Sequence, residues 1–103
     1  MPKQLVNHTT AEDTVEKILD GSDKRQGWRV QNRITNTPGS GNANFIEVLV
    51  QETPTPTYKT IATLNPGEYI SEYNYSFHIG FKEDIYVRCA AAGHKVDAYS
   101  ITL

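Results

Sequence analysis

The residue types that most often carry out chemistry are few and scattered in this chain. The three histidines, His8, His78 and His94, lie far apart, and Cys89 supplies the only thiol. No pair of them has the short spacing, such as His-x-His or Cys-x-x-Cys, that brings zinc ligands together. The sequence therefore predicts no metal centre and no internal disulfide, and we interpret Cys89 as a small core residue.

Carboxylates gather at residues 12–16 and 83–84. A glycosidase needs two carboxylates that face each other across a cleft, and nothing in the spacing of these acids predicts that. The Gly-Ser-Gly run at 39–41 is not followed by the helix start that a phosphate-binding loop requires, and the chain has no Gly-x-Ser-x-Gly elbow. We therefore expect a protein that is not an enzyme, needs no cofactor and acts by binding.

Composition narrows the kind of partner. The chain has 103 residues, a formal net charge of −2 and a pI of about 5.9, which argues against binding to nucleic acid or to an anionic membrane. Four basic residues could form a local patch, and we interpret them as a solvated strand face and turn: Lys24, Arg25, Arg29 and Arg33. No apolar run approaches the length of a membrane span, and the N-terminus lacks the apolar region of a signal peptide, so we expect synthesis in the cytoplasm.

The elements that must position any binding residues are predicted to be β-strands. Residues 27–35 alternate most clearly, with Trp28, Val30, Asn32 and Ile34 on one face and polar side chains on the other. Residues 45–50 are apolar on nearly both faces, which indicates a central strand. The Asn-Pro-Gly run at 65–67 is typical of a type II turn. Further strands are expected at residues 14–19, 58–64, 68–72, 77–81, 84–90 and 95–103.

This spacing of roughly seven or eight short strands with turns between them predicts an all-β fold, a single antiparallel β-sandwich or jelly-roll-like domain. We assign the domain to residues 13–103 and expect residues 1–12 to form an N-terminal arm. Loops are expected at 36–42 and 53–56, and turns at 74–76, 82–83 and 92–94.

Large apolar and aromatic side chains remain on the second face of several strands. If Ile85, Val87 and Cys89 face the core, Tyr86 faces outward, and the same reasoning applies along the strand at 45–50. Tyrosine is enriched at the centres of protein interfaces. The residues that we expect to contact a partner protein, including two apolar residues of the arm, are Leu5, Val6, Phe45, Leu49, Tyr86 and Tyr99.

The order of motifs resembles that of small virion proteins of tailed bacteriophages. The likeness spans residues 14–103 and rests on TVEKIL (14–19), DKRQGWRVQN (23–32), LNPGEY (64–69), DIYVRCAAAG (84–93) and VDAYSITL (96–103). The chain departs from the pattern in its longer loops at 36–42 and 52–57. The resemblance implies a capsid decoration (cement) protein of the virion that binds the major capsid protein or another virion protein, itself a homo-oligomer, with a trimer favoured.

Two alternatives stay open at this point. A head–tail connector or tail component of the same virion would share the sandwich but form a ring. A carbohydrate-binding β-sandwich module would use Trp28 and surface tyrosines to stack on sugar rings, although the position of Trp28 beside Val30 predicts that it lies in the core.

Overall fold

A computed structural model describes residues 3–21, 25–33, 45–52, 57–71, 84–90 and 92–102 of the chain. These residues form eight strands in two four-stranded antiparallel sheets, with the orders β1-β8-β3-β6 and β2-β7-β4-β5. The strands are β1 (Lys3–Thr9), β2 (Glu16–Leu19), β3 (Arg25–Asn32), β4 (Ile46–Glu52), β5 (Thr57–Leu64), β6 (Tyr69–Ser71), β7 (Ile85–Cys89) and β8 (Lys95–Thr102).

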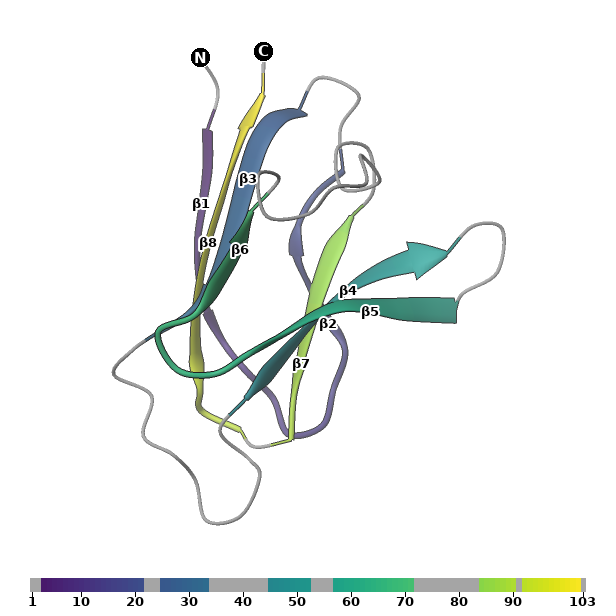
Figure 1. The fold of residues 1–103 in the computed structure, drawn as a ribbon, viewed down its shortest axis with the longest axis vertical. Coiled ribbons are helices and arrows are strands. Elements are labelled where there is room, and N and C mark those ends of the chain that lie inside the picture. The colour runs from purple at the N-terminus through teal and green to yellow at the C-terminus, as the bar shows by residue number, and fades with distance from the viewer. Residues whose placement is uncertain are drawn as a thin grey trace.

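The two sheets lie as two layers, and the chain passes repeatedly from one to the other (Figure 1). Two four-stranded antiparallel sheets with these interleaved orders constitute a jelly roll. The predicted all-β, sandwich-type fold is therefore confirmed. The hairpin formed by β4 and β5 extends away from the other sheet at the right of Figure 1.

The core lies between the layers because each strand turns its apolar side inward. In β3, Trp28 and Val30 are buried while Arg29 and Gln31 are half-buried, and in β7 the buried positions alternate with Tyr86 and Arg88. The predicted alternation is thus confirmed along 27–33 and 85–89, and Ile34 and Thr35 lie outside the described residues. The core cluster comprises Ile18, Leu19, Trp28, Val30, Ile46, Val48, Leu64, Ile70, Ile85, Val87, Cys89, Val96 and Ala98.

A buried asparagine fastens the turn that leads from β5 to β6. Asn32 donates from its side chain to the Leu64 carbonyl at 2.8 Å, and its own carbonyl accepts from the Gly67 N–H at 2.7 Å. Gly67 has a φ of 91°, and the Glu68 N–H donates to the Asn65 carbonyl at 2.9 Å. This is the type II turn that the Asn-Pro-Gly run predicts, with the left-handed position occupied by glycine.

Residues 3–9 are not an arm outside the sandwich. They form β1, which pairs with β8 residue by residue from Lys3 opposite Ile101 to Thr9 opposite Lys95. The division that we expected after residue 12 therefore does not separate this segment from the domain. Pairing with β1 satisfies the backbone N–H and C=O groups on one side of β8. The short, polar sequence of residues 3–9 gives no local sign of this pairing.

Some expectations fall outside the described residues: the strand at 77–81, the turns at 74–76 and 82–83, and the loops at 36–42 and 53–56. The central position predicted for the strand at 45–50 is confirmed, because β4 lies between β7 and β5. Within the described ranges, no helix is long and apolar enough to cross a membrane.

Candidate functional site

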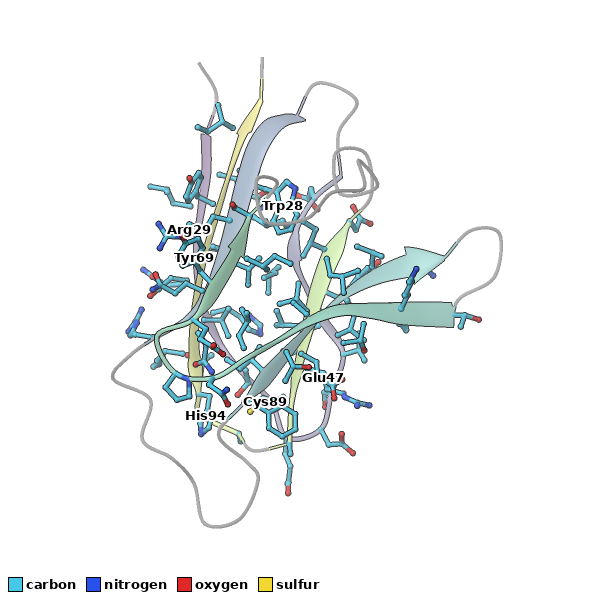
Figure 2. All side chains as sticks on the ribbon, in the orientation of Figure 1. Trp28, Arg29, Glu47, Tyr69, Cys89 and His94 are labelled. Carbon is cyan, nitrogen blue, oxygen red and sulfur yellow. The ribbon has the colours of Figure 1, made fainter. Side chains whose placement is uncertain are left out.

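The outer surface of the β1-β8-β3-β6 sheet, here named the β8 face, combines exposed and half-buried apolar, aromatic and charged side chains. Its members come from strand positions that alternate with the buried ones. They are Leu5, Asn7, Thr9, Arg29, Gln31, Arg33, Tyr69, Lys95, Asp97 and Tyr99. Figure 2 shows Arg29 and Tyr69 side by side on this outer side, whereas Trp28 points between the sheets.

Strand register places these side chains in two rows across the sheet. Tyr99 on β8 lies opposite Leu5 on β1 and opposite Arg29 on β3. Residues directly opposite each other in antiparallel strands share a face and touch, so these three form one row. Two residues along, Asp97 on β8 lies opposite both Asn7 and Gln31, which form the second row.

A depression of about 290 Å³ lies over these two rows. It is lined by Leu5, Val6, Asn7, Arg29, Gln31, Asp97, Ala98 and Tyr99. Leu5 stands at its margin with 75% of its surface exposed, the largest exposure of any large apolar side chain described. The depression thus offers an apolar contact, an aromatic ring, two amides and charged groups within one small area.

An ion pair holds the polar side of the depression. Arg33 donates from Nη2 to Asp97 Oδ1 at 2.6 Å and from Nε to Asp97 Oδ2 at 2.9 Å, and Nη2 also reaches Asn7 Oδ1 at 3.3 Å. The hydrogen bonds from Arg33 lower the pKa of Asp97 below its ordinary value of 3.8. Asp97 therefore stays ionised and is already engaged by a cation.

Arg29 is held differently. Its guanidinium carbon lies 4.1 Å from the centroid of the Tyr69 ring, a cation–π contact. Among the described residues, its one direct hydrogen bond is a long one of 3.4 Å from Nη2 to Gln31 Oε1, and its shielded Nε atom has no hydrogen-bond partner there. Gln31 is itself anchored, since its Nε2 donates to the Gly67 carbonyl at 3.2 Å. Arg29 is therefore oriented but has donors to spare.

The outer surface of the β2-β7-β4-β5 sheet, the β7 face, is more self-contained. Tyr86 packs edge-on against Tyr58 with ring centroids 4.9 Å apart, and its hydroxyl lies 3.3 Å from Gln51 Oε1. Leu49 lies opposite Tyr86 and so on the same face, yet only 5% of its surface is exposed. Arg88 is paired with Glu47, Nη2 to Oε2, at 2.9 Å. Within the described residues, the β7 face thus covers Leu49 and pairs Arg88, while Tyr58 remains 39% exposed.

The six residues that the sequence predicts to contact a partner lie in different parts of the structure. Leu5 and Tyr99 lie together on the β8 face, and Val6, one residue along, packs against the core instead. Leu49 and Tyr86 lie on the β7 face, and Phe45 is half-buried just before β4. The outward orientation expected for Leu49 and Tyr86 is confirmed, but Leu49 is covered by its neighbours.

The sequence predicts Arg29 only as part of a solvated strand face, and it does not single out Asn7 or Gln31 as candidates. Alternation along β3 does place Arg29, Gln31 and Arg33 on one face, so a signal for the cluster was present. The contact of Arg29 with Tyr69, which is 40 positions away in the chain, has no local signal. Only the pairing of β6 with β3 brings these two side chains together.

The other residues that could form a metal-binding or sugar-binding site do not come together in the described part of the chain. His8 Nε2 lies 3.2 Å from Glu16 Oε1, and Cys89 Sγ lies 3.4 Å from His94 Nδ1. No group of three or more His, Cys, Asp or Glu residues there could hold a metal ion, and His78 lies outside it. Trp28 is 1% exposed, as its strand position predicts, so it cannot serve as a platform for a sugar ring.

No family model, curated protein sequence or solved structure matches this chain. The assignment of a site therefore rests on the geometry of the β8 face.

Proposed function

We propose that this protein is a non-catalytic structural subunit that binds a partner protein through the β8 face. The observation that carries the proposal is the exposure of Leu5 at the margin of a depression that also contains Tyr99, on a surface that nothing within the described residues covers. An exposed apolar side chain beside an aromatic ring and convergent polar groups is typical of an interface centre.

The partner that we propose is the assembled shell of a virion, with the major capsid protein or another virion protein supplying the contact. Support comes from the motif order of the sequence and from the jelly-roll strand order, an architecture found in viral capsid and lectin domains. A subunit that binds the assembled shell and not its free components stabilises the shell by mass action. Many copies on a symmetric lattice would add weak contacts through avidity.

Incorporation into particles tests this proposal. Cells that produce the particles are supplied with the wild-type chain, with Leu5→Glu, or with Thr60→Glu, a control at an exposed position of the β7 face. Particles are separated on a density gradient, and the chain is quantified by mass spectrometry. We expect Leu5→Glu to lower incorporation by about tenfold or more, since a charge at an interface centre is desolvated without a partner, and Thr60→Glu to leave it unchanged.

A wild-type chain that remains at the top of the gradient would overturn the virion proposal. Equal incorporation of Leu5→Glu and wild type would overturn the role of the β8 face. Light scattering on the free protein adds the oligomeric state: a trimer supports a decoration protein, and a larger ring supports a connector or tail component instead.

A further inference from the structure

We propose that the β8 face binds an acidic segment of its partner protein, with a carboxylate of that segment held by Arg29 and a neighbouring apolar side chain packed on Leu5 and Tyr99. The inference rests on the proposed function, because it specifies the chemistry of the surface that the subunit binds. It makes Arg29 the residue that selects the partner.

Arg29 is a prearranged cation that has unused donors among the described residues. Guanidinium carries five N–H donors in a planar fork that matches a carboxylate. Stacking on Tyr69 fixes the plane of the Arg29 fork, and Gln31 uses one donor through a long hydrogen bond. Nε is shielded from solvent and has no hydrogen-bond partner among the described residues, so it is not the atom that an external group would reach. The side chain as a whole is half-buried, and a docking carboxylate would bind its terminal Nη donors.

Charge on the β8 face also favours an acidic partner. Its described side chains include three basic ones, Arg29, Arg33 and Lys95, and one carboxylate, Asp97, although the whole chain has a net charge of −2. Arg33 is committed to Asp97, and Lys95 donates to Thr9 Oγ1 at 2.7 Å. Within the described ranges, Arg29 has no carboxylate at ion-pair distance. An external acid is the group that this face lacks.

The spacing of Leu5 and Arg29 fits a short extended segment. Leu5 and Arg29 stand in one row on either side of Tyr99, so two strand spacings, about 10 Å, separate their backbones. An extended segment advances about 3.3 Å per residue, so an acid and an apolar residue two or three positions apart would reach both groups. The depression between them, of about 290 Å³, is large enough for one or two side chains and not for a bulky ligand.

An acidic peptide fits this surface better than an acidic sugar. The aliphatic side chain of Leu5 lies at the margin of the depression. Covering this side chain with a peptide removes apolar surface from water, which favours binding. A sugar would gain most from open aromatic rings, but Arg29 already occupies one face of the Tyr69 ring. That leaves Tyr99 as the one ring that lines the depression.

Nuclear magnetic resonance tests the inference directly. The probe is a short capped peptide with leucine and glutamate two residues apart, and its control has glutamine in place of glutamate. The ¹H–¹⁵N spectrum includes the Arg29 Nε–H, which is shielded and should be observable. We expect the glutamate peptide to shift this signal and the amides of Leu5, Asn7 and Tyr99 in a saturable manner, more weakly as salt rises.

Matched variants assign the effect. Arg29→Gln should weaken binding of the glutamate peptide by about tenfold or more, the factor expected for losing a charged hydrogen bond. Arg29→Lys, which keeps the charge without the fork, should lose part of the affinity. Arg88→Gln is the control, because Arg88 stands at a comparable outward position of the other sheet and is already paired with Glu47. If Arg29→Gln fails to fold, Leu5→Glu should lower affinity by repelling the peptide without altering Arg29.

Three results would overturn the inference. The first is the absence of a saturable shift with the glutamate peptide at low salt. The second is stronger binding of glucuronate at the same residues, which would make a sugar the occupant. The third is self-association of the protein alone, abolished by Arg29→Gln in light scattering, which would make a second copy the occupant. In the first case, a loss of particle incorporation for Leu5→Glu would still support the proposed function.

Discussion

The β8 face and the β7 face contain the same residue types but differ in how far these side chains are exposed and paired. Each has a leucine directly opposite a tyrosine on the neighbouring strand, Leu5 with Tyr99 and Leu49 with Tyr86. Each also has an outward arginine on a central strand, Arg29 or Arg88. Leu5 is 75% exposed and Leu49 is 5% exposed, so composition does not explain the difference.

Position within the sheet explains it. β4 is internal, so Leu49 has Tyr86 on one side and Thr60 on the other, and Tyr58 packs on Tyr86 beside them. β1 is an edge strand, so Leu5 has a cross-strand neighbour, Tyr99, on one side of it. A residue on an edge strand loses half of the neighbours that could cover it.

The arginines differ for a related reason. Arg88 has Glu47 directly opposite on β4, and the two form an ion pair. Arg29 has Tyr99 and Ser71 opposite, neither of which carries a carboxylate, and it stacks on Tyr69 instead. Within the described residues, the β7 face thus covers its leucine and pairs its arginine, whereas the β8 face exposes its leucine and gives Arg29 no carboxylate.

The largest expected contrast is in stability when each leucine is truncated. Leu49→Ala should lower the free energy of unfolding by about 2–4 kcal/mol, because it removes a buried side chain and leaves a cavity. Leu5→Ala should change it by less than about 0.5 kcal/mol, because the side chain is already in water. Equilibrium urea denaturation measures both. Equal losses would show that Leu5 is covered in the free protein and would remove the contrast between the faces.

A smaller effect is expected in acid, and it belongs to the β8 face. The pKa of Asp97 is lowered, chiefly by hydrogen bonds from Arg33, so its ionised form stabilises the folded state. This contribution is present above the ordinary pKa of 3.8 and is lost as pH falls through the lower value of the folded state. Because both side chains are partly exposed, the effect should be well below that of Leu49→Ala.

Asp97→Asn should therefore abolish this part of the acid dependence in urea denaturation at a series of pH values. Asp84→Asn, an exchange beside the β7 face, is the comparison for a general loss of charge. An Asp97→Asn protein that loses as much stability in acid as the wild type would show that the ion pair does not contribute.

The smallest expected effect is on the titration of Tyr86, on the β7 face. Burial raises the pKa of Tyr86 above its ordinary value of 10.0, and the charge of Asp84 raises it further. The neutral phenol therefore favours the folded state below pH 10, and this stabilisation is lost as pH rises through the folded value. Asp84→Asn should lower the pKa of Tyr86 while keeping an oxygen for the Gly21 N–H, which donates to Asp84 Oδ1 at 2.6 Å.

Absorbance titration of tyrosinate measures this pKa, and Tyr86→Phe identifies which component of the curve belongs to Tyr86. A titration that Asp84→Asn leaves unchanged would show that Asp84 does not contribute to the raised pKa.

Much of the fold followed from local patterns. Alternation predicted the inward and outward sides of β3 and β7, the apolar run predicted an internal β4, and Asn-Pro-Gly predicted the turn after β5. The N-terminal strand was missed because its inward positions, Gln4, Val6 and His8, include one apolar residue and so give no period-two signal. Its pairing with β8 is a contact between the two ends of the chain.

By itself, the sequence determined the β-strand character of the chain and the inward and outward sides of β3 and β7. These properties depend on side-chain type and on the two-residue period of a strand, which are local. Tertiary structure alone decided that Leu5 stays exposed while Leu49 is covered, and that Arg29 meets Tyr69 instead of a carboxylate. Exposure and charge pairing depend on which strands become neighbours, and strand order is set by contacts between segments far apart in the chain.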